Sequence, residues 1–142
     1  PWQHVLEPLS GYLSLAHKLF NNSSLNGQSY NFGPDESNKQ NVENLIRNLA
    51  KEWEFSDLDK SYQIEKLNEF HEAGLLQLDC SKARQELNWE STLLYDQMVS
   101  FTSSWYKEFY QNKGGENMIL KTFEQIDNYE NIAQDKNFEW SK

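Results

Sequence analysis

The sequence contains one pattern typical of proton-transfer chemistry, a tyrosine four residues before a lysine: Tyr62-Gln-Ile-Glu-Lys66. A lysine ammonium at this spacing can lower the pKa of the tyrosine hydroxyl. In oxidoreductases such a pair works beside a bound dinucleotide, which needs a glycine-rich turn between a strand and a helix. The six glycines, at positions 11, 27, 33, 74, 114 and 115, form no such turn. We therefore interpret the pattern as a coincidence and predict no catalytic residue in this chain.

Histidine and cysteine give no stronger candidate for catalysis or metal binding. His4, His17 and His71 are far apart in the sequence and have no cysteine neighbours, so we predict no metal site. Cys80 is the single cysteine, which excludes an internal disulfide and fits a reducing cytoplasm. A lone cysteine is more often a buried small apolar residue than a reactive thiol. We predict that role for Cys80 and a cytoplasmic location for the protein.

The amino-acid composition restricts the kinds of molecule that the protein can bind. The chain has 142 residues, with five Trp, seven Tyr and eight Phe, enough for one domain with a packed core. A net charge of −9 argues against nucleic-acid and anionic-membrane surfaces, which both require a basic patch. The sequence contains no run of about 18 apolar residues, the length that is needed to cross a membrane. Because the chain begins at Pro1 rather than at a methionine, we expect it to be part of a longer protein.

The hydrophobic pattern predicts an α/β fold: a small, mostly helical lobe with a few short strands. Strands are expected at residues 1–6, 29–32 and 75–78. The pattern of residues 54–70 is ambiguous, with a strand at 62–67 as one alternative. Ser81 is expected to cap a short helix, and Thr122 and Gln125 have capping-box spacing. Helices are expected at residues 7–20, 41–53, 82–87, 93–110 and 123–132. The first of them carries an apolar stripe of Leu9, Tyr12, Leu13, Ala16, Leu19 and Phe20.

Four segments, in order, are similar to one enzyme family. The opening Pro1-Trp-Gln-His-Val-Leu-Glu-Pro string resembles the segment that opens the substrate lobe of CDP-glucose 4,6-dehydratases, which are extended short-chain dehydrogenases/reductases. His71-Glu-Ala, followed by Leu-Asp79-Cys-Ser-Lys-Ala and Leu-Asn88-Trp, resembles a later segment of that lobe. Tyr30-Asn-Phe-Gly resembles a strand of the family's substrate lobe, and the stretch from Thr122 to Tyr129 resembles the helix that closes that lobe. The resemblance spans essentially the whole chain.

The resemblance implies a division of labour. In the family, an N-terminal Rossmann domain holds NAD and the catalytic Tyr/Lys pair, and the C-terminal lobe closes over the nucleotide-sugar. The reaction oxidises the sugar, eliminates water and returns the hydride. The expected function of this chain is therefore to bind CDP-glucose, with no cofactor of its own, and whether the isolated chain is an enzyme stays open. The alternative is a free-standing module that binds a nucleotide-sugar or a protein.

The resemblance also implies substrate-binding residues. Glu72 lies seven residues before Asp79, the interval at which related enzymes place an acid that accepts the ribose hydroxyls. His71 is a weaker candidate for the same pocket, and His4 lies on the segment that enters the cleft in the family. Glu7 is expected to shape the start of the first helix, where an acid suits the helix dipole. Asn88 stands where the family has glycine, and it tolerates the left-handed conformation needed there.

Two further expectations concern organisation. Residues 1–112 are expected to form the nucleotide-sugar-binding lobe, and residues 113–142 a flexible joint, a closing helix and a polar tail. A lobe without its Rossmann partner should expose apolar surface that the partner would cover. A homo-oligomer is therefore possible.

Overall fold

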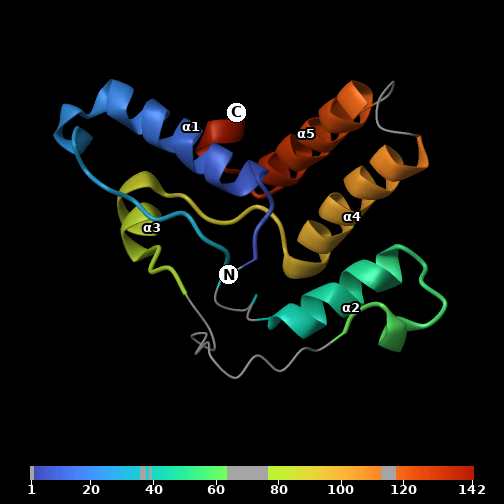
Figure 1. Ribbon diagram of the computed structural model, residues 1–142. Helices are drawn as coiled ribbons and strands as arrows, with labels where there is room; N and C mark the ends of the chain where they lie inside the picture. Colours follow the sequence, from blue (N-terminus) through green and yellow to red (C-terminus); the bar gives the residue numbers. More distant parts are fainter. Residues whose placement is uncertain (1, 36–37, 39, 64–76, 113–117) are drawn as a thin grey trace.

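The computed structural model describes residues 2–35, 38, 40–63, 77–112 and 118–142. Figure 1 shows α4 and α5 as an antiparallel pair, with α2 beside α4, and α1 running above α3. Short 3-10 helices, η1 (Ser23–Leu25), η3 (Leu58–Lys60) and η4 (Glu139–Ser141), lie in the connections and near the C-terminal end. The α-helices are α1 (Leu6–Asn21), α2 (Val42–Glu52), α3 (Ser81–Leu87), α4 (Tyr95–Gln111) and α5 (Met118–Asp135).

The α/β fold class predicted from the sequence is wrong: the described residues are helical and contain no strand. Residues 2–4 and 29–32, where strands are expected, have no regular secondary structure and are held by side chains instead of a backbone ladder; Val5 lies in a turn and Leu6 already belongs to α1. Gln3 donates from Nε2 to the Phe32 carbonyl at 3.2 Å, and Asn31 donates from Nδ2 to the Asp79 carbonyl at 3.1 Å. Most of the strands expected at 62–67 and 75–78 falls outside the described residues.

Helix α1 buries the face opposite to the one that its apolar stripe predicts. Leu9, Leu13 and Phe20 are exposed, Phe20 by 90%. The buried face instead consists of small or polar residues, Glu7, Ser10, Gly11 and Ser14. Small residues let neighbouring segments approach closely, and the polar ones find partners inside. These exposed residues leave an apolar stripe on the surface of α1.

The buried face of α1 forms a polar network with distant segments. The Glu7 carboxylate accepts from the backbone N–H groups of Thr92 (2.9 Å) and Leu93 (2.7 Å), just before α4 begins. The Tyr129 hydroxyl on α5 lies 3.1 Å from Glu7 Oε2 and 3.0 Å from Ser10 Oγ. Trp89 donates from its indole to Ser10 Oγ at 3.0 Å. Glu7 therefore joins three elements, a larger role than the helix-dipole contact expected from its position in the first turn.

Two apolar clusters flank this network. One surrounds Trp89, where the Phe32 ring meets the indole edge-on with centroids 5.0 Å apart. The other lies between α2, α4 and α5 and includes Met98, Val99 and Tyr129. Because Trp89 and Tyr129 belong both to a cluster and to the polar network, apolar packing and hydrogen bonding stabilise the same contacts.

The helix ends confirm one sequence prediction and correct two. Asn88 ends α3 in the left-handed conformation, with φ 54° and ψ 35°, as predicted. The Ser81 hydroxyl does not cap α3; Asp79 Oδ1 instead accepts from the Ser81 N–H at 2.9 Å. Thr122 lies inside α5, because the helix begins at Met118, and its hydroxyl donates to the Met118 carbonyl at 2.7 Å. The predicted division of the chain after residue 112 stays a prediction.

Gly11 provides the first test of this packing. A Cβ at Gly11 would lie 2.4–2.7 Å from atoms of the Phe32 ring, too close for any real contact. We expect Gly11→Ala to lower the free energy of unfolding by about 1–3 kcal/mol, measured by urea denaturation. The Phe32→Leu variant lacks the aromatic ring. In that variant, Gly11→Ala should lower the free energy of unfolding by clearly less than in the unchanged protein. Equal costs in both backgrounds would contradict the packing described.

Glu7 provides a test that depends on pH. Burial raises the pKa of its carboxyl above 4.5, although the bonds from Thr92 and Leu93 act in the opposite direction. The folded state then holds the proton more tightly than the unfolded state, so this contribution to stability falls as pH rises from 4.5 through the folded pKa. Relative to Glu7→Gln, the unchanged protein should lose stability over this range. Urea denaturation at a series of pH values measures the difference in the free energy of unfolding between the unchanged protein and Glu7→Gln. The control is Glu130→Gln, which changes an exposed acid on α5. A flat difference would refute the prediction.

Candidate binding cleft

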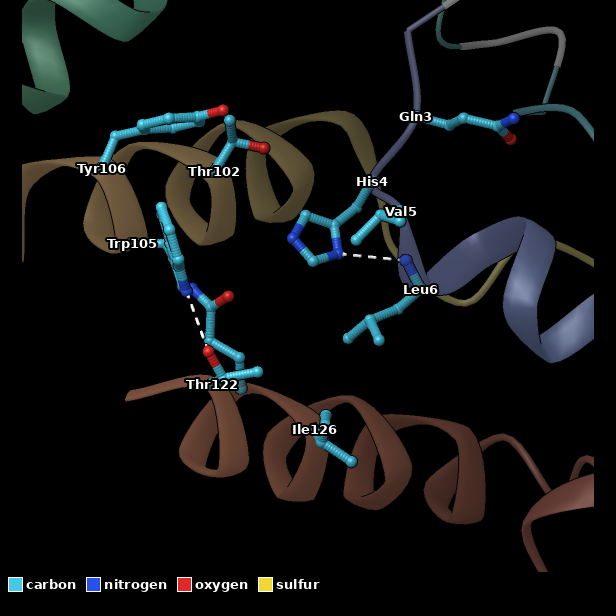
Figure 2. A pocket seen from close by; sticks show the side chains of 10 residues that line it. Gln3, His4, Val5, Leu6, Thr102, Trp105, Tyr106, Thr122 and Ile126 are labelled. Atoms are coloured by element: carbon cyan, nitrogen blue, oxygen red, sulfur yellow. Dashed lines mark hydrogen bonds between the residues drawn. The ribbon is translucent and has the colours of Figure 1, made fainter. Parts of the chain in front are cut away.

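A cleft of about 370 Å³ lies between the N-terminal segment, α4 and α5. Its size falls within the range of pockets that bind small molecules, about 300–1,000 Å³. Figure 2 shows His4 from the N-terminal segment and Trp105 from α4 on opposite sides of this space, with Thr122 of α5 below Trp105. The lining residues are Gln3, His4, Val5, Leu6, Thr102, Trp105, Tyr106, Thr122, Gln125 and Ile126.

The His4 imidazole is held in one orientation. Its Nδ1 accepts from the Leu6 backbone N–H at 3.4 Å, and its ring meets the Phe101 ring edge-on, with centroids 5.6 Å apart. Burial lowers the pKa of His4 from 6.5, because the charged imidazolium is poorly solvated there. With Nδ1 accepting, the neutral ring carries its proton on Nε2. His4 therefore presents an N–H donor on its other edge.

The opposite wall is aromatic and fixed. Trp105 donates from Nε1 to Thr122 Oγ1 at 3.0 Å, which ties α4 to α5 (Figure 2). Its indole stacks on Phe109, with planes 9° apart and centroids separated by 5.7 Å. The Tyr106 ring meets the indole nearly perpendicularly, at 80°. These contacts hold the indole in place without a ligand.

The cleft is mostly apolar, with a few polar groups. Among the residues that the structure describes, its lining includes no Asp, Glu, Lys or Arg, and His4 is neutral above its lowered pKa. Gln125 donates from Nε2 to the Phe101 carbonyl (2.6 Å) and to Ser104 Oγ (3.1 Å), so both bonds use its amide nitrogen and leave its oxygen as an acceptor. The described lining thus offers a donor, an acceptor and an aromatic face, and none of its residues carries a cation that would neutralise a phosphate.

A second cavity, of about 290 Å³, lies between α2 and α4. Thr102 and Tyr106 line both cavities. The Ser103 hydroxyl is buried here and has no hydrogen-bond partner in the described structure. The other lining residues are mostly apolar: Ile46, Leu49, Ala50, Trp53, Phe55 and Ser61.

Of the predicted substrate-binding residues, the structure places His4 in the cleft. Glu72 and His71 lie outside the described residues, so their roles stay predictions. The sequence predicts a capping role for Thr122 and gives no signal that Trp105 lines a cavity, because periodicity identifies a helix face without showing which residues border a cavity. The packing of α4 against α5 is a tertiary feature that no local signal reports.

The Tyr62 hydroxyl is engaged in an ion-pair cluster on α2. It donates to Glu43 Oε1 at 2.5 Å and accepts from Arg47 Nη2 at 2.9 Å. The bond to Glu43 raises the pKa of Tyr62, the opposite of what a tyrosine acid–base catalyst needs. Lys66 lies outside the described residues. The interpretation of the Tyr62/Lys66 pattern as a coincidence therefore stays a prediction.

Other candidate chemistry is limited. Cys80 is buried, as predicted, and burial raises the pKa of its thiol. Among the residues that the structure describes, no group of three or more His, Cys, Asp or Glu side chains could hold a metal ion. No helix in the described parts of the chain is long and apolar enough to cross a membrane.

Comparison with known proteins supports the resemblance found in the sequence. The chain is homologous to part of a larger nucleotide-sugar dehydratase. That relative is the CDP-glucose 4,6-dehydratase of Salmonella typhimurium (strain LT2), 34% identical over 129 residues. The match covers 91% of this chain but 34% of the relative's length, which is consistent with a C-terminal lobe of such an enzyme. No protein-family model matches the chain.

The environment of His4 can be tested directly. We expect its imidazole to titrate below pH 6.5, because burial disfavours the charged form. Histidine ring resonances followed by NMR during a pH titration measure this, with His4→Phe to assign the signal. A midpoint at or above 6.5 would show that the ring is solvated and would contradict the geometry of the cleft.

Proposed function

We propose that this chain is the nucleotide-sugar-binding lobe of a CDP-glucose 4,6-dehydratase. The similarity to the Salmonella enzyme across 91% of the chain carries this proposal. Glu72, with His71, would bind the nucleotide ribose, because a carboxylate can accept from two hydroxyl groups at once. His4 would contact the substrate from the uncharged cleft. The lobe contributes binding and orientation, which supply much of a rate enhancement once the reacting groups are present.

The redox chemistry belongs to another part of the enzyme in this proposal. NAD would bind a Rossmann domain, because the glycines of this chain form no dinucleotide-binding turn. The lobe is accordingly not catalytic alone. Its exposed apolar stripe on α1, which includes Leu9, Leu13 and Phe20, is a suitable surface for that domain to cover.

The same stripe favours a second candidate function, a free-standing module that binds a protein partner or a second copy of itself. The two candidates differ in their ligands. The lobe proposal requires recognition of a nucleotide-sugar, whereas an interaction module requires only the apolar surface. Self-association that is lost in Leu13→Glu, together with no nucleotide binding, would favour the module.

Calorimetric titration of the chain with CDP-glucose and ADP-glucose tests the lobe proposal. We expect CDP-glucose to bind more tightly, and Glu72→Ala to weaken it at least about 10-fold, since hydrogen bonds to a charged group contribute about 1.5–3 kcal/mol. Glu130→Ala, an exposed acid on α5, is the matched control and should bind normally. Equal binding of both nucleotide-sugars, or full affinity in Glu72→Ala, would overturn the assignment.

A further inference from the structure

We propose that the cavity between α2 and α4 is a second binding site, for a small uncharged aromatic molecule that carries a hydroxyl group, such as a phenol. The two helices that form it lie side by side in Figure 1. Neither His4 nor Trp105 lines this cavity. The inference therefore does not depend on the function proposed for the cleft.

The lining of this cavity suits an apolar ring. Its volume is about 290 Å³, and a cavity of about 150 Å³ lined by Leu, Ile and Phe is large enough to hold benzene. Helix α2 contributes aliphatic side chains, and Trp53, Phe55 and Tyr106 contribute aromatic rings. Among the described residues, the lining includes no Asp, Glu, Lys or Arg. A charged ligand would lose hydration there without gaining an ion pair, whereas an aromatic ring would be removed from water.

One polar group in this lining has no partner. Ser103 is 2% exposed, and its hydroxyl makes no hydrogen bond in the described structure. A buried hydroxyl without a partner is unfavourable. The neighbouring Ser104 avoids this cost, because its hydroxyl donates to the Phe101 carbonyl at 3.1 Å. The Ser103 hydroxyl is thus available to a ligand that brings a hydrogen-bonding group into the cavity.

A phenol matches both features of the lining. Its ring can pack against the aromatic side chains of the wall, in the edge-on or offset arrangements that aromatic pairs prefer. Its hydroxyl can donate and accept, so it can pair with Ser103 whichever way the serine hydroxyl turns. An aliphatic alcohol would lack the ring contacts, and a plain hydrocarbon would leave Ser103 unpaired.

Titration of the ¹⁵N-labelled chain with phenol and with toluene, followed by NMR, tests this proposal. The Trp53 indole N–H signal, identified by its loss in Trp53→Phe, should shift with phenol. We expect Ser103→Ala to weaken phenol binding about 5- to 10-fold, the effect of one neutral hydrogen bond, and not to weaken toluene binding. The matched control is Ser100→Ala, which changes an exposed serine of α4 and should bind phenol as before.

The stability of Ser103→Ala provides a second measurement. Because the variant removes a hydroxyl that has no partner, we expect it to be at least as stable as the unchanged chain in urea denaturation without ligand. A clear loss of stability would show that the hydroxyl is already paired inside the protein, and would overturn the proposal.

The remaining outcomes are also decisive. A Trp53 signal that does not move at millimolar phenol, or equal phenol affinity in Ser103→Ala, overturns the proposal. A shift of the Trp105 signal without one of Trp53 would place the phenol in the cleft and overturn it as well. A Trp53 signal that moves with protein concentration, without phenol, would make the cavity a contact between two copies of the chain instead.

Discussion

The carboxylate of Glu7 is the contact on which the arrangement of the helices depends. It is 1% exposed and accepts two backbone N–H groups from the segment that leads into α4, while Tyr129 of α5 lies within hydrogen-bonding distance. An unpaired buried carboxylate would be strongly unfavourable, so these donors have to be in place when α1 packs. Their geometry therefore positions α4 and α5 relative to the N-terminal segment. The cleft is a consequence of that arrangement, since its walls come from these three elements.

This requirement also explains the orientation of α1. Burying Glu7, Ser10 and Gly11 turns the stripe that includes Leu9 and Leu13 toward the solvent. The network satisfies its polar groups internally, and Gly11 leaves room for the Phe32 ring. The packing of α1 thus combines specific internal contacts with an apolar stripe that stays exposed.

Much of the local structure was predictable. Each of the five α-helices in the described residues falls on an expected helix, although α5 begins at Met118 and not at residue 123, and the residue types explain the left-handed end of α3 at Asn88. The absence of strands from the described residues was not predictable in the same way. A short apolar run is compatible with a strand whether or not a neighbouring segment pairs with it. The segment at 29–32 has no regular secondary structure and is held by side chains such as Asn31. In the candidate site, the sequence indicates His4, whereas the position of Trp105 in the wall of the cleft depends on the packing of α5 against α4.

The sequence by itself determined the homology, the helical segments and the absence of a dinucleotide-binding turn, because each of these depends on residue types at short, fixed intervals. Only the tertiary structure decided which face of α1 is buried, which donors satisfy Glu7 and where a cavity remains between α4 and α5. These features depend on contacts between residues up to 122 positions apart, such as Glu7 and Tyr129. A periodic pattern contains no information about such contacts, since it describes one helix and not its neighbours.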